Sequence, residues 1–403
     1  MRPLVDIVGT RYPVRSSATT GTHIPRVTAR NLIKEKTMRT ILFGLLCMTA
    51  SCLADVGGEE CVGKRCKADD DMMGSGSATT PGCETPEERT TNLVIRSDAD
   101  FAALPKGCWS LNANLRIEGS ATTSLAGLGD LTDVNDLELV DTGLTSIATK
   151  KTITVYGSLH VSGNTKLANL NNLAVKRWDG ITQGGDFQVA YTIRNNGALT
   201  AIDGLKYIAQ VDSDLRITDN PKLTAIELNE LTKVTGGVHI TGTGATAIRF
   251  PVLATLGRLE VANNPALTQI SGLVATSISG DVTLRTNPAL TTIGTMSSLT
   301  LIGGSLVLDD NDALVDLTNL IPTGMNRISG ALTISNNARL TGLGKLSSML
   351  DGVNGAVTIT SNPALSVCTA IAIDHCAQVG TTAAVISGNS GVANNCGNCW
   401  CNR

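Results

Sequence analysis

The chain has 403 residues, of which 42% are hydrophobic and 3% aromatic, and its formal net charge is −3. This length exceeds that of most single globular domains. Surfaces that bind nucleic acids need clustered Lys and Arg together with aromatic rings for stacking, so the composition excludes a nucleic-acid partner.

The N-terminal region reads as an export signal behind an unpatterned prefix. Residues 1–37 are basic, without a hydrophobic period, and are interpreted as an upstream segment that is unstructured or not translated. Residues 38–54 carry Arg39 and then an apolar run of the length of a signal peptide, too short to span a membrane. The stretch "TASC" resembles a bacterial lipoprotein processing site, which predicts lipidation at Cys52 and attachment to a membrane, although Thr49 stands where Leu is usual. Cleavage after Ala54 and secretion is the alternative.

Cysteines are confined to the two ends of the exported chain. None occurs between residues 108 and 368, and this distribution predicts disulfides in an oxidising compartment. A zinc site at Cys396, Cys399 and Cys401 with His375 nearby is the alternative; we expect no metal and no cofactor. The disulfide candidates are Cys61, Cys66, Cys83, Cys108, Cys368, Cys376, Cys396, Cys399 and Cys401.

Two short segments precede the regular part of the chain. Residues 55–91 mix acids, Ser, Gly, Thr and Pro without an apolar period, which predicts a disordered tether. Residues 93–96 predict a first strand. Ser97 is a suitable N-cap for a short helix ending near Leu104, which would cover the open end of a stack of strands.

Within the predicted solenoid, residues 92–367, one phrase repeats from Leu115 onward. Two aliphatic residues stand two apart, an Asn follows three residues after the second, and apolar residues return three and six residues later, as in "LRITDNPKLTAI" at 215–226. Thr142 and Thr243 take the place of the Asn in two copies. The period of about 21–26 residues predicts an all-β solenoid of about eleven rungs. The repeated asparagines are Asn164, Asn196, Asn220, Asn264, Asn287, Asn311, Asn337 and Asn362.

The spacing also predicts how each rung folds. Aliphatic residues two apart face the same side of a strand, so both point into the core. The Asn tolerates the tight corner that follows, and its amide can bond the backbone that the corner leaves unpaired. One rung cannot bury its own apolar edge, so stability comes from stacking.

The phrase I-x-G-x-L-x-I-x-x-N-x-x-L, seen most fully in "LIGGSLVLDDNDAL" at 301–314, resembles the receptor L domains, which carry leucine-rich-repeat-like rungs. The resemblance implies a right-handed β-helix with short helical caps at both ends and a protein-binding sheet face. The layout is similar to bacterial surface lipoproteins with tandem L-type repeats. Residues 368–403 are similar to the Cys-rich closing cap of such proteins, with a helix near 369–378 and a last strand near 384–387.

The residues between the paired aliphatics form the best candidate for a binding surface. Stacking makes these outward residues neighbours, charged toward the N-terminal end of the solenoid and Thr or Val toward its C-terminal end. An unknown protein or glycan at the cell surface is the expected partner; the alternative is that the charges only keep the sheet soluble. The candidate binding residues are Arg116, Glu138, His160, Arg194, Arg216, His239, Glu260 and Arg285.

The sequence holds no G-x-S-x-G, H-E-x-x-H, P-loop or G-x-G-x-x-G motif of the catalytic families. Asp309, Asp310 and Asp312 could serve a Ca²⁺ site or an acid/base pair, but we favour a solvated turn, because Ca²⁺ needs roughly 6–8 oxygen ligands and this stretch supplies few. Trp178, Phe187 and Tyr191 cluster around an insertion and could either stack on sugars or pack that loop down. We therefore expect a non-catalytic surface protein that binds, adheres or shapes the envelope. A carbohydrate-active β-helix enzyme and a purely structural spacer are the alternatives.

Overall fold

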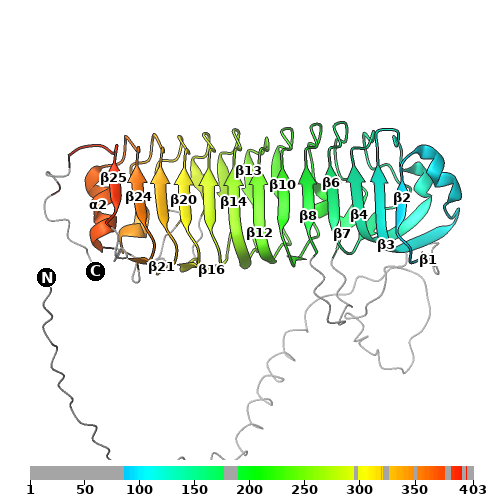
Figure 1. The fold of residues 1–403 in the computed structure, drawn as a ribbon, viewed down its shortest axis with the longest axis horizontal. Helices are drawn as coiled ribbons and strands as arrows, with labels where there is room; N and C mark the ends of the chain where they lie inside the picture. The colour runs from blue at the N-terminus through cyan, green and yellow to red at the C-terminus, as the bar shows by residue number, and fades with distance from the viewer. Residues whose placement is uncertain are drawn as a thin grey trace, which may run out of the picture. The chain divides into compact units, whose positions relative to one another are not determined.

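The computed structural model describes residues 86–176, 189–294, 298–318, 320, 326–348, 352–376, 383–392 and 396. These residues form a solenoid of stacked, parallel β-strands with short helices at its two ends (Figure 1). The predicted all-β solenoid is confirmed.

The main side of the solenoid is a continuous parallel column of strands. The eleven predicted rungs, from Leu115 to Val357, all lie in it, and β2 and β25 add one strand at each end. Each strand pairs with the next rung in register. In stacking order the strands are β2 (Leu93–Ile95), β3 (Cys108–Glu118), β4 (Asp130–Val140), β6 (Leu159–Ser162), β8 (Tyr191–Arg194), β10 (Leu215–Thr218), β12 (Lys233–Thr241), β14 (Thr255–Ala262), β17 (Val282–Arg285), β20 (Leu306–Asp309), β22 (Leu332–Ser335), β24 (Val357–Thr360) and β25 (Val385–Ser387).

Two further columns complete the rungs. The long strands β3, β4, β12 and β14 contribute their first residues to a second column, where they pair with shorter strands. The shorter strands are β1 (Glu87–Arg89), β5 (Ile153–Val155), β7 (Leu173–Val175), β9 (Gln210–Val211), β16 (Ser277–Ile278), β19 (Leu301–Ile302), β21 (Arg327–Ile328) and β23 (Gly352–Val353). After the Asn corner, a separate four-stranded sheet consists of β11 (Ala225–Glu227), β13 (Ala247–Arg249), β15 (Gln269–Ser271) and β18 (Thr292–Ile293).

The core is built from the repeated aliphatics. In one rung Leu215, Ile217, Leu223 and Ile226 are each 0% exposed, although they come from two different sides of the solenoid. Equivalent residues of neighbouring rungs belong to the same hydrophobic cluster. Burying an aliphatic side chain is worth roughly 1.5–3 kcal/mol, so each rung depends on the rungs above and below it.

The repeated asparagines form the predicted ladder, and all eight are fully buried. Asn220 shows the pattern: its Oδ1 accepts the N–H of Asn196 at 3.1 Å, and its Nδ2 donates to the carbonyls of Ile193 and Thr218, both at 2.9 Å. The ladder continues one rung further than predicted, because Asn389 Oδ1 accepts the N–H of Asn362 at 3.3 Å. The sequence signal was present, since Asn389 follows Ile386 by the usual three residues.

The residue directly before each ladder position turns the corner in the left-handed region. Non-glycine residues tolerate this region poorly, Asn and Asp better than most. Gly163, Gly242 and Gly388 adopt it in three rungs. In the others φ lies between 51° and 58°, at Asp141, Asn195, Asp219, Asn263, Thr286, Asp310, Asn336 and Ser361.

Short helices cover the ends and some connections. At the first end, η1 (Asp98–Ala103) begins after Ser97, as predicted, and Asp100 Oδ2 accepts the N–H groups of Arg96 and Ser97 at 2.7 and 2.9 Å. Two short 3₁₀ helices, η2 (Ala126–Leu128) and η3 (Asp203–Leu205), lie within connections, and η4 (Gly344–Ser348) lies near α2 (Val367–Cys376) at the other end.

Both predicted end caps are confirmed, with one correction to a boundary. The predicted tether, residues 55–91, extends too far, because Glu87–Arg89 form β1 and pair with β3. This pairing depends on backbone hydrogen bonds to a rung more than 20 residues away, which no local pattern announces. The rest of the tether, the prefix and the signal segment lie outside the described residues.

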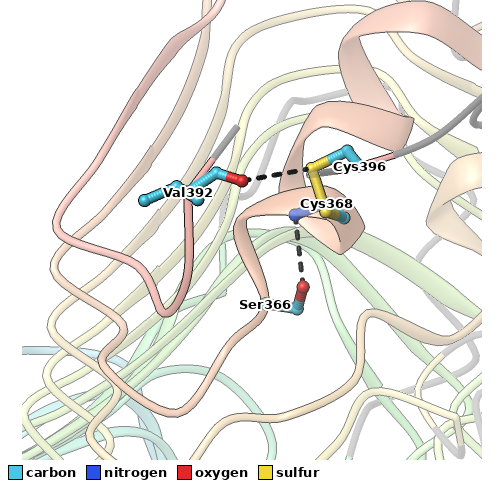
Figure 2. The surroundings of a disulfide bond; sticks show 4 residues. All are labelled: Ser366, Cys368, Val392 and Cys396. Carbon is cyan, nitrogen blue, oxygen red and sulfur yellow. Dashed lines mark hydrogen bonds between the residues drawn. A yellow bond between two sulfur atoms is a disulfide. The ribbon is translucent and has the colours of Figure 1, made fainter. Parts of the chain in front are cut away.

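Cys368 and Cys396 form a disulfide that ties the C-terminal tail to α2 (Figure 2). Ser366 Oγ accepts the N–H of Cys368 at 3.2 Å at the start of the helix. The zinc alternative is therefore wrong for Cys396, whose sulfur is bonded to Cys368. Cys108 is also disulfide-bonded, and Cys376 ends α2. The remaining candidates, Cys61, Cys66, Cys83, Cys399 and Cys401, lie outside the described residues, as does Cys52.

Candidate functional site on the outer face

Each main-column strand places three residues outward: one before the first inward aliphatic, one between the two aliphatics, and one after the second. We call the surface made by these residues the outer face, and the middle row its central row. The predicted stacking of the central row is confirmed by the strand register. In order it holds Val94, Arg116, Glu138, His160, Thr192, Arg216, His239, Glu260, Thr283, Val307, Thr333, Thr358 and Val385.

Arg194 and Arg285 belong to the row after the second aliphatic. In register, that row runs from Arg194 through Thr218, Thr241 and Ala262 to Arg285. The structure thus brings all eight candidate residues onto one face, in two adjacent rows. Their role in binding stays a prediction.

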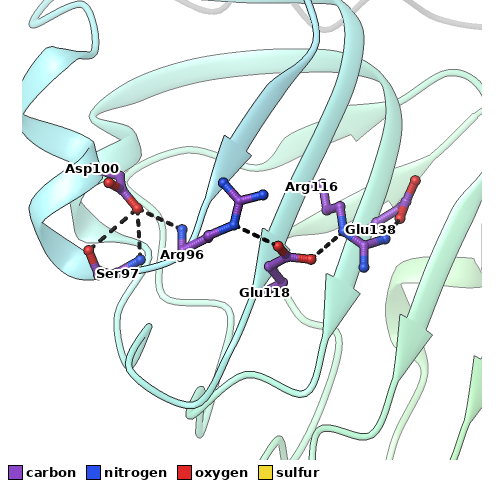
Figure 3. Close-up of polar contacts among 6 residues, drawn as sticks. All are labelled: Arg96, Ser97, Asp100, Arg116, Glu118 and Glu138. Atoms are coloured by element: carbon purple, nitrogen blue, oxygen red, sulfur yellow. Dashed lines mark hydrogen bonds and ion pairs between the residues drawn. The ribbon is translucent and has the colours of Figure 1, made fainter.

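An ion-pair network covers the N-terminal part of the outer face (Figure 3). Glu118 bonds Arg96 Nε at 2.9 Å and Arg116 Nε at 2.5 Å, and Arg116 also pairs with Glu138. The hydrogen bond from Arg116 holds the pKa of Glu118 below its usual range. Sequence reasoning missed Arg96 and Glu118, although both follow the second aliphatic of their strands.

His160 lies next to this network and is half-buried. Its Nε2 lies 2.9 Å from Ser162 Oγ, two residues along the same strand. Burial lowers the pKa of His160, and the positive charges of Arg194 and Arg116 lower it further, against an opposing effect of Glu138. His160 therefore favours its neutral form more than a free imidazole does.

A second polar cluster occupies the middle of the outer face. Arg216 Nη2 pairs with Asp214 Oδ2 at 2.5 Å, and His239 Nδ1 lies 2.8 Å from Glu260 Oε2. Partial burial alone would raise the pKa of Asp214, but hydrogen bonds from the Gly237 N–H and from Arg216 outweigh it and lower that pKa. Asp214 was missed because its position, before the first aliphatic, was not considered.

The expectation that His239 is exposed is wrong: the residue is 4% exposed, although its position in the row points outward. The ring fits because Gly237 has no side chain, and a Cβ there would come within 2.4 Å of His239 Nε2. His239 Nε2 has no hydrogen-bond partner and lies 3.8 Å from Asp214 Oδ1. His239 can therefore affect a partner only through Glu260 and Asp214.

From the rung of Leu306 onward, the outer face is nearly uncharged. Its acid there, Asp309, accepts hydrogen bonds from Ser335 Oγ at 2.6 Å and Asn336 Nδ2 at 2.8 Å, so it stabilises the stacking of neighbouring rungs. Within the described ranges, no group of three or more His, Cys, Asp or Glu residues could hold a metal ion.

Of the three clustered rings, Tyr191 packs in the core at 0% exposure, in the inward row with Leu159 and Leu215. It is therefore no platform for an exposed sugar. Trp178 and Phe187 lie outside the described residues.

Comparison with known proteins gives one distant similarity. The chain is 26% identical over 167 residues to a protein of Arthroderma benhamiae described as a cell surface GPI-anchored protein. The match covers 37% of this chain and 42% of that relative, so it spans less than half of either protein. No protein-family model and no solved structure matches the chain. None of the helices among the described residues is sufficiently long and apolar to cross a membrane. The similarity fits a protein that is exported or displayed at the surface.

Proposed function

We propose that this protein is a non-catalytic cell-surface protein that uses the N-terminal and central parts of the outer face to bind another component of the envelope. The observation that carries the proposal is the unbroken register of polar residues from Arg116 to Glu260 on one rigid sheet. Solenoids present such extended surfaces without a cleft. The surface description of the distant relative supports the location.

The ion pairs and hydrogen bonds that the carboxylates already make support a binding role over catalysis. A glycosidase needs two carboxyl groups that are available to a substrate on either side of the scissile bond. Here Glu118 and Glu138 are held by arginines, Asp214 by Arg216 and a backbone N–H, and Glu260 lies against His239. Groups already engaged in this way suit a fixed charge pattern for recognition.

Two finer points remain part of the proposal. Lipidation at Cys52 would anchor the protein to the membrane, and the likeness to receptor L domains would make the bound component a protein or a glycan recognised on the sheet face. Both follow from short sequence phrases.

The location is tested by protease shaving and lipid labelling of native cells that carry the wild type or Cys52→Ala. We expect the wild type to be shaved and labelled, and the variant to be unlabelled. Unlabelled, soluble wild-type protein would overturn the anchor.

The binding face is tested with the full chain immobilised against solubilised envelope fractions. We expect a charge reversal, Arg216→Glu with Glu260→Lys, to lower the capture of the retained component. Arg339→Glu is the matched control, because Arg339 is exposed and lies on a turn away from the outer face. Equal retention by all three proteins would contradict the proposed face.

A further inference from the structure

The carboxylates of the outer face are engaged by donors of the protein itself. Besides the four acids described above, Asp309 accepts two side-chain donors. Asp136 and Asp281, each directly before its first aliphatic, accept the backbone N–H groups of Ser158 and Ser305 at 2.6 and 2.7 Å. These acids therefore help to hold the rungs and the arginines in place.

Three exposed arginines of the outer face, Arg194, Arg258 and Arg285, have no ion pair or side-chain hydrogen bond among the described residues. The other three, Arg96, Arg116 and Arg216, are ion-paired. An exposed guanidinium has five N–H donors suited to carboxylates. The charged donors of this face that have no partner among the described residues are therefore the guanidinium groups of these three arginines.

These three arginines surround the centre of the face. Arg194 and Arg285 stand in the same row, separated by Thr218, Thr241 and Ala262, which is four strand spacings or about 19 Å. Arg258 stands two residues before Glu260, on the other side of the central row. The residues between the arginines are small: Thr218 and Thr241 are partly buried, and Ala262 is 1% exposed.

We propose that this surface binds an extended acidic polysaccharide lying along the stacked strands, with its carboxylates on Arg194, Arg258 and Arg285. This inference rests on the proposed function and specifies its partner. Charge complementarity over about 19 Å favours a polymer with regularly spaced carboxylates. The exposed large hydrophobic residues of the described chain are Val94, Tyr207, Val252, Val274, Val315, Val385 and Val392.

None of those residues lies between the three arginines. A neutral sugar would need a ring for stacking and a peptide would need an apolar anchor, and the centre of the face supplies neither. Three acids oppose the proposed ligand. Asp281 and Asp309 stand beside Arg258 and Arg285 in the neighbouring rungs, where each also accepts hydrogen bonds of the protein. Asp219 is exposed at the corner directly after Thr218. Removal of Asp219 should therefore strengthen binding, which gives the proposal a test of opposite sign.

The probe is polygalacturonate, titrated against the full chain by calorimetry at low ionic strength, with neutral dextran and poly-L-glutamate in parallel. We expect polygalacturonate to bind, dextran to give no heat, and poly-L-glutamate to bind at least about tenfold more weakly. Affinity should fall steeply between roughly 0.05 and 0.5 M salt, because exposed charges are screened.

The variants decide the site. Arg194→Glu with Arg285→Glu should lower the affinity for polygalacturonate by about tenfold or more, since each change replaces an attraction to a carboxylate by a repulsion. Asp219→Asn should raise it, and Arg339→Glu should leave it unchanged. Arg194→Gln with Arg285→Gln replaces the reversal if that variant unfolds at a lower temperature than the wild type.

Four outcomes would overturn the inference: no binding of polygalacturonate, equal binding of poly-L-glutamate, the same affinity in the Arg194/Arg285 variants, or a loss as large in Arg339→Glu. The proposed function fails separately. If envelope capture depends on Arg216 and Glu260 while polygalacturonate does not bind, the surface role stands and the polysaccharide is wrong. If polygalacturonate binds through the arginines but the protein is absent from the surface, the site stands and the proposed location is wrong.

Discussion

At the residue scale, the ladder asparagine is the side chain that joins one rung to the next. Its carbonyl oxygen accepts a backbone N–H while its NH₂ group donates to backbone carbonyls. Asn287 is an example: its Oδ1 accepts the N–H of Asn264 at 3.2 Å, and its Nδ2 donates to the carbonyl of Val261 at 3.0 Å. Thr243 can replace only part of this, through a hydroxyl that donates to Asn264 Oδ1 at 2.7 Å. Asp would lack the donors altogether.

Replacing a ladder asparagine should therefore be costly. Asn287→Ala leaves two buried backbone groups without partners, and each such group costs about 1–3 kcal/mol. We expect the free energy of unfolding to fall by roughly 2–5 kcal/mol, and Asn287→Thr to cost less, because two rungs already carry Thr at this place. Urea denaturation measures both. Thr283→Ala, on the outer face of the same rung, is the control and should change stability by no more than about 0.5 kcal/mol; a similar small effect for Asn287→Ala would contradict the role of the ladder.

The ladder could be predicted because Asn recurs at a fixed distance from the paired aliphatics. The burial of His239 could not, because it depends on Gly237 two residues earlier, which leaves space for the ring, and on Glu260 in the next rung. Alternation alone places every residue of the central row in solvent. The exception arises from a glycine position whose effect on a neighbouring ring is seen only in three dimensions.

At the scale of the elements, strand register decides the electrostatic surroundings of each outward group. His160 on β6 pairs in register with Glu138 on β4 and with Thr192 on β8. Arg194 lies two residues after Thr192 on the same strand. Predicting the order of the rungs was sufficient to predict these neighbours. It was insufficient to predict the first strand, β1, which has no paired aliphatics and is held by pairing with β3.

The surroundings of His160 predict a pH dependence. Its pKa in the folded protein lies below the usual 6.5, so the unfolded chain binds a proton more readily. The stability that follows from this difference is present above about pH 6.5 and is lost as the pH falls below that value toward the folded-state pKa. We expect the melting temperature to decline between about pH 7.5 and 5.5 by less in His160→Gln than in the wild type.

A second variant separates the causes. Arg194→Gln removes one of the charges that lower the pKa of His160, and should reduce the decline in part. The measurement is thermal unfolding of the three proteins at matched ionic strength. Identical declines in the wild type and His160→Gln would show that other groups govern the acid sensitivity.

At the scale of the whole solenoid, the rungs are similar but the two ends are not. An inner rung has a neighbour on each side, whereas a terminal rung would leave apolar side chains and strand backbone exposed. At the C-terminal end β25 pairs with β24, and Ala370 and Ile373 of α2 are fully buried. The helix and the last strand thus close the stack, and their place was predictable because the repeat stops where the cysteines resume.

Removing this cap should convert the end of the solenoid into a site of association. Deletion of residues 367–403 takes away α2 and β25, so the edge of β24 and the core residue Leu365 lose their cover. We expect the truncated protein to form oligomers that grow with concentration, measured by size-exclusion chromatography with light scattering. The control is Cys368→Ser with Cys396→Ser, which keeps the cap and removes only the disulfide; it should stay monodisperse while losing about 2–4 kcal/mol of stability. If the truncated protein is as monodisperse as this control, the cap serves stability alone and the exposed edge does not recruit a second chain.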